Sequence, residues 1–184
     1  MSEKDTTNSS RDIRQFCMER GTIVGIITSA SFLCSMYGLS NFLLGQVSNL
    51  LGLLAIAMAG TGIRNYRREK GNITFGRACW MAMLTYFYAI LLTALTQYIY
   101  FAFLDHGMLL GQLQKFVEMP EYRQLLQHMA GEEDIDTMIQ TTLGVLGKPA
   151  QATMQFMWVN CFASLLFTIP TALIGITGKL KKED

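Results

Sequence analysis

The feature that most restricts the fold is a set of three long stretches that contain no charged residue. They cover residues 21–63, 78–104 and 149–178 of the 184-residue chain. A helix that crosses a bilayer needs about 20 mostly apolar residues, so the first stretch has room for two spans and each of the others for one. A soluble helix of this length would carry charges on its solvent face. The sequence therefore predicts an all-α integral membrane protein built as a four-helix bundle.

Turn residues divide the chain further. The sequence YGLSN after residue 36 separates the first two spans, and Pro149 suits the first turn of the last span. A cleaved signal peptide is not expected, because a long polar segment precedes the first span and a second span follows it. The expected organisation is a polar cytoplasmic segment (1–19), a membrane domain (20–178) with spans at about 20–37, 42–63, 78–104 and 150–178, an external helical segment (105–149) and a basic cytoplasmic tail (179–184).

The external segment shows helical periodicity in two places. MPEYRQLLQHMAG (119–131) has a proline that suits a helix start and a glycine that suits its end. EEDIDTMIQTTLGVLG (132–147) opens with acids, which are favourable at a helix N-terminus. We expect two short amphipathic helices on the outer side. They either pack on the bundle, which we prefer, or lie on the lipid surface.

The orientation follows from the basic residues, because short cytoplasmic loops are enriched in Lys and Arg. Twelve basic residues fall on the side of the two termini and three on the other side. Both termini are therefore expected in the cytoplasm. The topology-determining loop after the second span also contacts anionic lipid headgroups, and its position between spans disfavours a nucleic-acid interface. Its basic residues are Arg64, Arg67, Arg68, Lys70 and Arg77.

Aromatic residues support this placement, since Trp and Tyr favour the two membrane surfaces. Tyr66 and Trp80 flank the expected inner boundary. For two tyrosines within the third span we prefer core packing. The residues expected near the outer boundary are Tyr37, Tyr98, Tyr100 and Trp158, and those expected in the core are Tyr86 and Tyr88.

Small residues recur along the second span at alternating steps of three and four. In lipid, helices associate through close contact across such residues, and this period favours a left-handed pair. A series in the first span (Gly21, Gly25, Ser29) matches it, so we expect these two spans to form a tight hairpin; a homodimer contact is the alternative. The packing seam consists of Gly45, Ser48, Gly52, Ala55, Ala59 and Gly62.

The polar residues inside the spans are amides and hydroxyls. Gln97 and Asn160 are candidates for hydrogen bonds between helices. Apart from Arg20 at the edge of the first span, no Asp, Glu, Lys, Arg or His lies in a span, so the usual proton relay of a transporter is missing. The sequence has no nucleophile elbow, no Walker phosphate-binding loop and no H-E-x-x-H zinc motif. The four cysteines do not show the C-x-x-C or Cys/His spacing of a metal site. No catalytic residue, cofactor or metal is predicted.

The loop into the third span resembles a known family. The sequence IRNYRREKGNITFGRA, followed by the aromatic third span and a helical segment, is similar to the bacterial membrane proteins grouped as domain of unknown function 4199. The resemblance covers residues 15–178 and implies a four-helix inner-membrane protein without an assigned activity. The matching positions are Tyr66, Arg67, Gly71, Ile73, Thr74, Phe75, Gly76 and Ala78, with Arg77 at a basic position.

Three functional hypotheses remain. The first is a non-enzymatic structural, accessory or regulatory membrane protein, whose partners are lipids and another membrane protein or a second copy. It predicts that Gly52→Leu disrupts assembly, whereas alanine at Gln97, Asn160 or His106 is tolerated. The second is a small-solute or lipid transporter with a cavity lined by Gln97, Asn160 and Tyr86. The third is a membrane enzyme that uses His106 with the external acids.

Overall fold

The computed structural model describes residues 3–38, 41–120 and 135–177, and every regular element among them is helical. Four helical segments are long and apolar enough to cross a membrane: Arg11–Gly38, Phe42–Lys70, Phe75–Leu104 and Pro149–Ile176. The chain is thus an all-α membrane helical bundle with four spans. Its elements are α1 (Glu3–Gly38), α2 (Phe42–Lys70), α3 (Phe75–Ile99), the π-helical turn η1 (Tyr100–Leu104), α4 (Met108–Glu118), α6 (Ile135–Leu146) and α7 (Pro149–Ile176).

The described residues fall into two compact units. One consists of residues 1–93 with 157–184, and the other of residues 94–156. The first unit holds α1, α2, most of α3 and most of α7. The second holds the end of α3, η1, α4, α6 and the start of α7.

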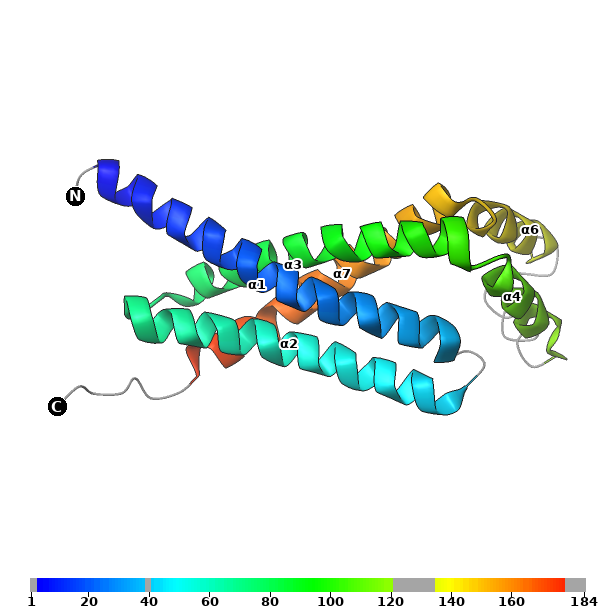
Figure 1. The fold of residues 1–184 in the computed structure, drawn as a ribbon, viewed down its shortest axis with the longest axis horizontal. Coiled ribbons are helices and arrows are strands. Elements are labelled where there is room, and N and C mark those ends of the chain that lie inside the picture. The colour runs from blue at the N-terminus through cyan, green and yellow to red at the C-terminus, as the bar shows by residue number, and fades with distance from the viewer. Residues whose placement is uncertain (1–2, 39–40, 121–134, 178–184) are drawn as a thin grey trace. The chain divides into compact units, whose positions relative to one another are not determined.

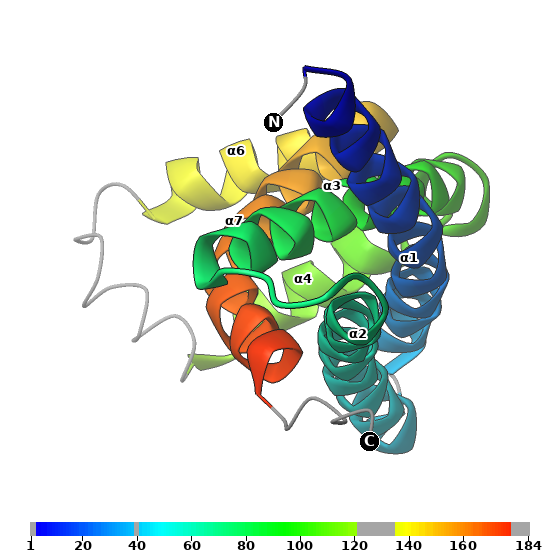
Figure 2. The same ribbon diagram turned by 90° about the vertical axis from the view of Figure 1, so that its left-hand side faces the viewer.

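In the first unit, α1 and α2 lie side by side and antiparallel (Figures 1 and 2). Asn41 begins α2, where its side-chain oxygen accepts a hydrogen bond from the Leu43 backbone N–H at 3.1 Å. Such an N-cap satisfies one of the free N–H groups of the first turn. The hairpin that we expected between the first two spans is therefore confirmed.

Two clusters of buried side chains form the core of the first unit. One joins α1, α2, α3 and α7 through Ile13, Cys17, Ile63, Tyr66, Ala78, Met81, Ala82 and Ala172. The other joins α1, α2 and α3 through Val24, Ala55, Ala59, Tyr86 and Ala89. Several members are alanines, so the backbones approach closely, as helices in lipid require.

The helical segment between the third and fourth spans differs in part from the prediction. Helix α6 (Ile135–Leu146) confirms the second expected amphipathic helix. Helix α4 (Met108–Glu118) was not predicted, although Asp105 precedes it and accepts a hydrogen bond from the Leu109 backbone N–H in its first turn. Two left-handed residues, His106 (φ 46°) and Gly107 (φ 81°), separate α4 from the third span. The first expected amphipathic helix lies mostly outside the described residues.

Two of the tyrosines expected near the membrane boundaries are buried within the protein. Tyr66 is only 5% exposed and packs its ring against Phe16, with 4.9 Å between the ring centroids. Tyr100 is 1% exposed within η1. Both belong to the protein interior and not to a membrane-surface belt, because neighbouring helices cover them. Tyr86 is a buried core residue, as expected.

Candidate functional site

The basic loop contains residues of two kinds. Arg67 turns back into the bundle, where its Nη1 donates to the backbone carbonyl of Ile176 at the end of α7 and its Nη2 to Asn72 Oδ1 at 3.3 Å. A helix C-terminus has unpaired carbonyls and a partial negative charge, so a guanidinium there stabilises it. Lys70 forms an ion pair with Asp12 of α1 at 3.4 Å, but both side chains are more than half exposed.

The remaining basic residues of the loop face outward. Arg68 and Arg77 are exposed and Arg64 is half-buried. An exposed ion pair such as that of Lys70 contributes little to stability. Arg67 is thus the loop residue whose guanidinium bonds the end of α7, and sequence reasoning, which treated all five residues alike, missed this difference.

The residues of the packing seam in the second span differ in how closely they contact neighbouring helices. Ala55, Ala59 and Gly62 are buried, and a Cβ at Gly62 would contact the Arg20 side chain of α1 at 3.2 Å. Ser48 contacts α1 through Ser31. Gly45 lies close to the end of α1, since a Cβ at Gly38 would lie 2.7 Å from Gly45 Cα, whereas a Cβ at Gly52 would meet nothing within 4 Å.

The glycines of the first span face a different partner from the one we expected. A Cβ at Gly21 would lie 2.7 Å from the Thr85 carbonyl oxygen, and one at Gly25 would lie 3.2 Å from Ala89 Cα. Both glycines therefore pack against α3 and not against the seam of α2. A small-residue series identifies a close-packed face, but it does not identify the helix that covers that face.

Sequence reasoning also missed the contact between α2 and α7. A Cβ at Gly60 would lie 2.8 Å from Ile174 Cβ and 3.2 Å from the Thr171 carbonyl oxygen. A Cβ at Gly175 would lie 2.9 Å from Ile63 Cβ. Each helix thus contributes one glycine to the crossing, and Gly60 lies outside the alternating pattern by which the seam was identified.

Hydroxyl groups join the helices of the first unit. The Oγ1 atoms of Thr28 in α1 and Thr93 in α3 lie 2.7 Å apart. The Tyr86 hydroxyl of α3 and Thr171 Oγ1 of α7 lie 2.5 Å apart. Ser31 of α1 bonds the Ser48 carbonyl of α2 at 2.9 Å.

The predicted intramembrane amides behave differently. Gln97 is 1% exposed, and its Oε1 accepts no hydrogen bond from the described residues. Asn160 is half-buried. Neither forms a hydrogen bond between helices within the part of the chain that the structure describes, and Tyr86, which we placed with them in a possible cavity, is bonded to Thr171.

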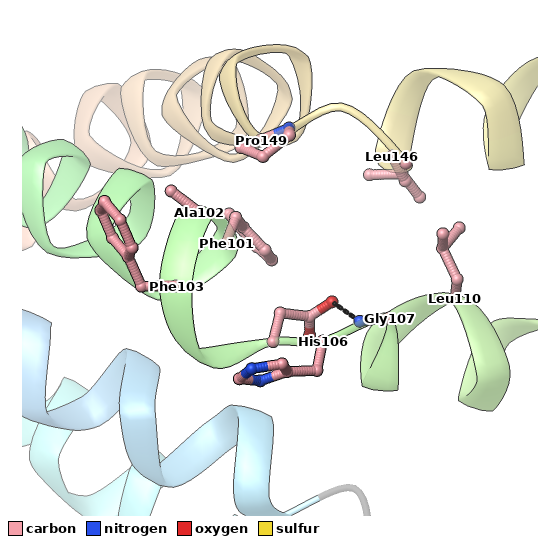
Figure 3. A pocket seen from close by; sticks show the side chains of 10 residues that line it. Phe101, Ala102, Phe103, His106, Gly107, Leu110, Leu146 and Pro149 are labelled. Atoms are coloured by element: carbon pink, nitrogen blue, oxygen red, sulfur yellow. Dashed lines mark hydrogen bonds between the residues drawn. The ribbon is translucent and has the colours of Figure 1, made fainter.

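A cavity of about 160 Å³ lies within residues 94–156 (Figure 3). Leu110 of α4 and Leu146 of α6 point toward each other across it, and Phe101 extends toward it from η1. The cavity is situated where the third span ends at Leu104 and the fourth begins at Pro149. Its lining is Phe101, Ala102, Phe103, Asp105, His106, Gly107, Leu110, Leu146, Gly147 and Pro149.

Asp105 is the buried charged residue of this lining, at 9% exposure. Its Oδ2 accepts a hydrogen bond from Gly107 N at 3.2 Å and its Oδ1 one from Leu109 N at 3.1 Å, so it caps the first turn of α4. His106 is exposed, and its Nδ1 lies 3.0 Å from the Leu104 carbonyl oxygen. The two side chains are not joined as a catalytic dyad. Of the acids proposed to assist His106, residues 132–134 lie outside the described residues.

Comparison with known proteins assigns the chain to a family. No curated protein and no solved structure matches the chain. One family model, described as "Protein of unknown function (DUF4199)", matches residues 19–175. This range contains the small-residue contacts, the basic loop and the cavity described above. Because the match covers most of the sequence, the chain belongs to the DUF4199 family.

Proposed function

We propose that this protein is a non-enzymatic accessory or regulatory membrane protein that acts through its helix contacts and through the segment between its third and fourth spans. The observation that supports this proposal is the pairing of hydroxyls in the first unit. Thr28 bonds Thr93, Ser31 bonds Ser48, and Tyr86 bonds Thr171. Side chains that bond one another between helices stabilise a fixed packing, whereas a transport pathway needs polar groups that bind a solute.

The membrane location is part of the same proposal. We place the protein in a bacterial inner membrane with both termini in the cytoplasm, because the excess of Lys and Arg lies on that side of the spans. The exposed side chains of Arg68 and Arg77 then meet anionic headgroups. A reporter fused after Gly71 tests the orientation: it should be active only on the cytoplasmic side, and external activity would contradict it.

In-cell crosslinking tests the accessory role. A photoreactive group is attached at Gln114 in α4 or Thr142 in α6, both exposed. The matched control is Phe162 in α7, which is 64% exposed within a span and is expected to face lipid. We expect a discrete adduct, with another membrane protein or a second copy, from the first two sites and not from the control. Adducts of equal yield from all three sites would contradict a specific contact.

The alternative is a small-solute or lipid transporter. The observation in its favour is Gln97, whose buried Oε1 lacks a partner among the described residues. Vesicles reconstituted with the protein distinguish the two functions. A solute or lipid flux that is lost in Gln97→Leu, at unchanged protein content, would favour the transporter and overturn the accessory role.

A further inference from the structure

The cavity between η1, α4, α6 and the start of α7 combines an almost buried carboxylate with aromatic and aliphatic walls. We propose that it binds the ammonium group of a small organic cation, of the size of choline or ethanolamine. This inference concerns a site within residues 94–156, and it does not depend on the accessory role proposed for the bundle.

The charge of the ligand follows from Asp105. This side chain is 9% exposed, and its hydrogen bonds are with two backbone N–H groups. It forms no ion pair within the described part of the chain; Lys148, next to the lining residues Gly147 and Pro149, is exposed. A buried carboxylate is costly unless a cation or several donors compensate for it. Two backbone N–H donors already compensate part of this cost. The negative charge that remains in the lining favours a cation over a phosphate or carboxylate ligand.

The walls select an organic cation. Phe101 is 8% exposed and stacks on Phe156 with 5.4 Å between the ring centroids, which holds its ring in place. Phe103, also in the lining, is 71% exposed. Aromatic faces attract ammonium groups, most strongly where water is excluded. A calcium or magnesium ion, in contrast, requires several oxygen ligands, and Asp105 is the one carboxylate among the lining residues.

The size of the cavity fits this ligand. A cavity of about 150 Å³ accommodates a benzene-sized molecule, and this one measures about 160 Å³. An ammonium group with two or three methyl or methylene substituents is of this size. Larger amphiphiles would have to leave their remaining atoms outside the cavity.

Two sources can supply such a group. The cavity lies at the level where the third span ends and the fourth begins, which is the depth of lipid headgroups. The ammonium is therefore either the ethanolamine headgroup of a phospholipid or a soluble amine. The chemistry of recognition is the same in both cases.

The test uses the full chain in nanodiscs of phosphatidylglycerol, whose headgroup lacks nitrogen. Choline chloride is titrated by calorimetry, and 3,3-dimethylbutan-1-ol, its uncharged analogue of similar shape, is titrated in parallel. We expect saturable binding of choline and none of the alcohol. Repeating the choline titration in phosphatidylethanolamine nanodiscs identifies the source, because a headgroup ligand weakens choline binding by competition and a soluble ligand does not.

Three variants separate ligand binding from helix capping. Asp105→Asn retains a side-chain oxygen that caps α4 but removes the charge, and it should weaken choline binding about tenfold or more. Leu110→Phe fills the cavity without altering Asp105 and should weaken binding similarly. Asp12→Asn removes an exposed carboxylate elsewhere and should leave binding unchanged.

The outcomes decide the proposal. Absence of choline binding to the folded protein in phosphatidylglycerol, equal binding of the alcohol, or unchanged affinity in both Asp105→Asn and Leu110→Phe would each overturn it. If Asp105→Asn fails to fold, loss of binding in folded Leu110→Phe still supports the site, and retention of binding there contradicts it.

Discussion

The two compact units of this protein differ in what their buried polar groups bond. In the unit of residues 1–93 and 157–184, hydroxyls of α1, α2, α3 and α7 bond one another across helices. In the unit of residues 94–156, the Oε1 of Gln97 lacks a partner among the described residues, and Asp105 faces a cavity. Side-chain pairs between helices stabilise one arrangement of them. The contrast is not complete, since Arg67 Nε in the first unit also lacks a partner among the described residues, and both Asp105 oxygens accept backbone N–H groups. We propose that the first unit serves as a scaffold and the second as a binding region.

The largest effect that tests the scaffold is expected at the crossing of α2 and α7. Gly60→Ala places a Cβ 2.8 Å from Ile174 Cβ, which forces the helices apart. We expect a loss of about 2 kcal/mol in the free energy of unfolding. Reversible denaturation in mixed micelles of increasing SDS fraction measures it.

Gly52→Ala is the matched control on the same helix, because a Cβ there meets nothing within 4 Å. It should be neutral or stabilising by up to about 1 kcal/mol, the helix preference of alanine over glycine. This expectation replaces the one drawn from the sequence, in which Gly52 was central to the seam. Equal destabilisation by the two substitutions would show that the crossing is not at Gly60.

A second effect is expected at the C-terminus of α7. Arg67→Gln removes the guanidinium that bonds the Ile176 carbonyl and should cost about 1–2 kcal/mol, since the donor is charged but only partly buried. Arg68→Gln, at an exposed neighbour, should change the free energy of unfolding by less than about 0.5 kcal/mol. The same unfolding assay compares the two variants. Equal changes in the free energy of unfolding would show that Arg67 does not stabilise the end of α7.

A smaller effect is expected from the buried hydroxyl pair of α3 and α7. Tyr86→Phe removes the hydrogen bond with Thr171 and should cost about 0.6 kcal/mol, the average for hydrogen bonds between membrane helices, and at most about 1.7 kcal/mol. Tyr88→Phe is the control on the same helix, since its hydroxyl forms no hydrogen bond within the described residues. If the Tyr86→Phe protein is as stable as the Tyr88→Phe protein, the hydrogen bond between Tyr86 and Thr171 does not stabilise the packing of α3 and α7.

In the unit of residues 94–156, a substitution at a buried polar residue is expected to leave the free energy of unfolding unchanged or to raise it. Gln97→Leu replaces a buried acceptor that lacks a partner with an apolar side chain of similar size. The free energy of unfolding should stay the same or rise by up to about 1 kcal/mol. A clear loss of stability would mean that Gln97 is bonded in the membrane, and the contrast between the two units would weaken.

Much of the fold follows from the sequence for a simple physical reason. Lipid excludes charge from a spanning helix, so the absence of charge marks all four spans. Helix α6 is marked in the same direct way by its periodicity. Helix α4 is not, because its separation from the third span depends on the left-handed backbone of His106 as well as Gly107, and residues other than glycine adopt that conformation uncommonly.

The contacts of the candidate site could not be predicted in the same way. Asp105 lies more than forty residues from Leu146 and Pro149, and no spacing rule links them; the fold alone brings them to one cavity. Likewise, the glycines of the first span indicate a close contact without identifying α3 as the partner. Local pattern predicts elements and faces, whereas the pairing of faces depends on the whole chain.

The joining of helices through span hydroxyls can be measured at the pair Thr28 and Thr93, whose Oγ1 atoms lie 2.7 Å apart. Both are changed to cysteine in a chain whose four native cysteines are replaced by alanine, and disulfide formation in native membranes is followed under mild oxidation. The control pairs Thr22→Cys, at an exposed position of α1, with Thr93→Cys. We expect rapid intramolecular disulfide formation in the Thr28→Cys, Thr93→Cys protein and little in the control. Equal rates in both proteins would contradict the contact between Thr28 and Thr93.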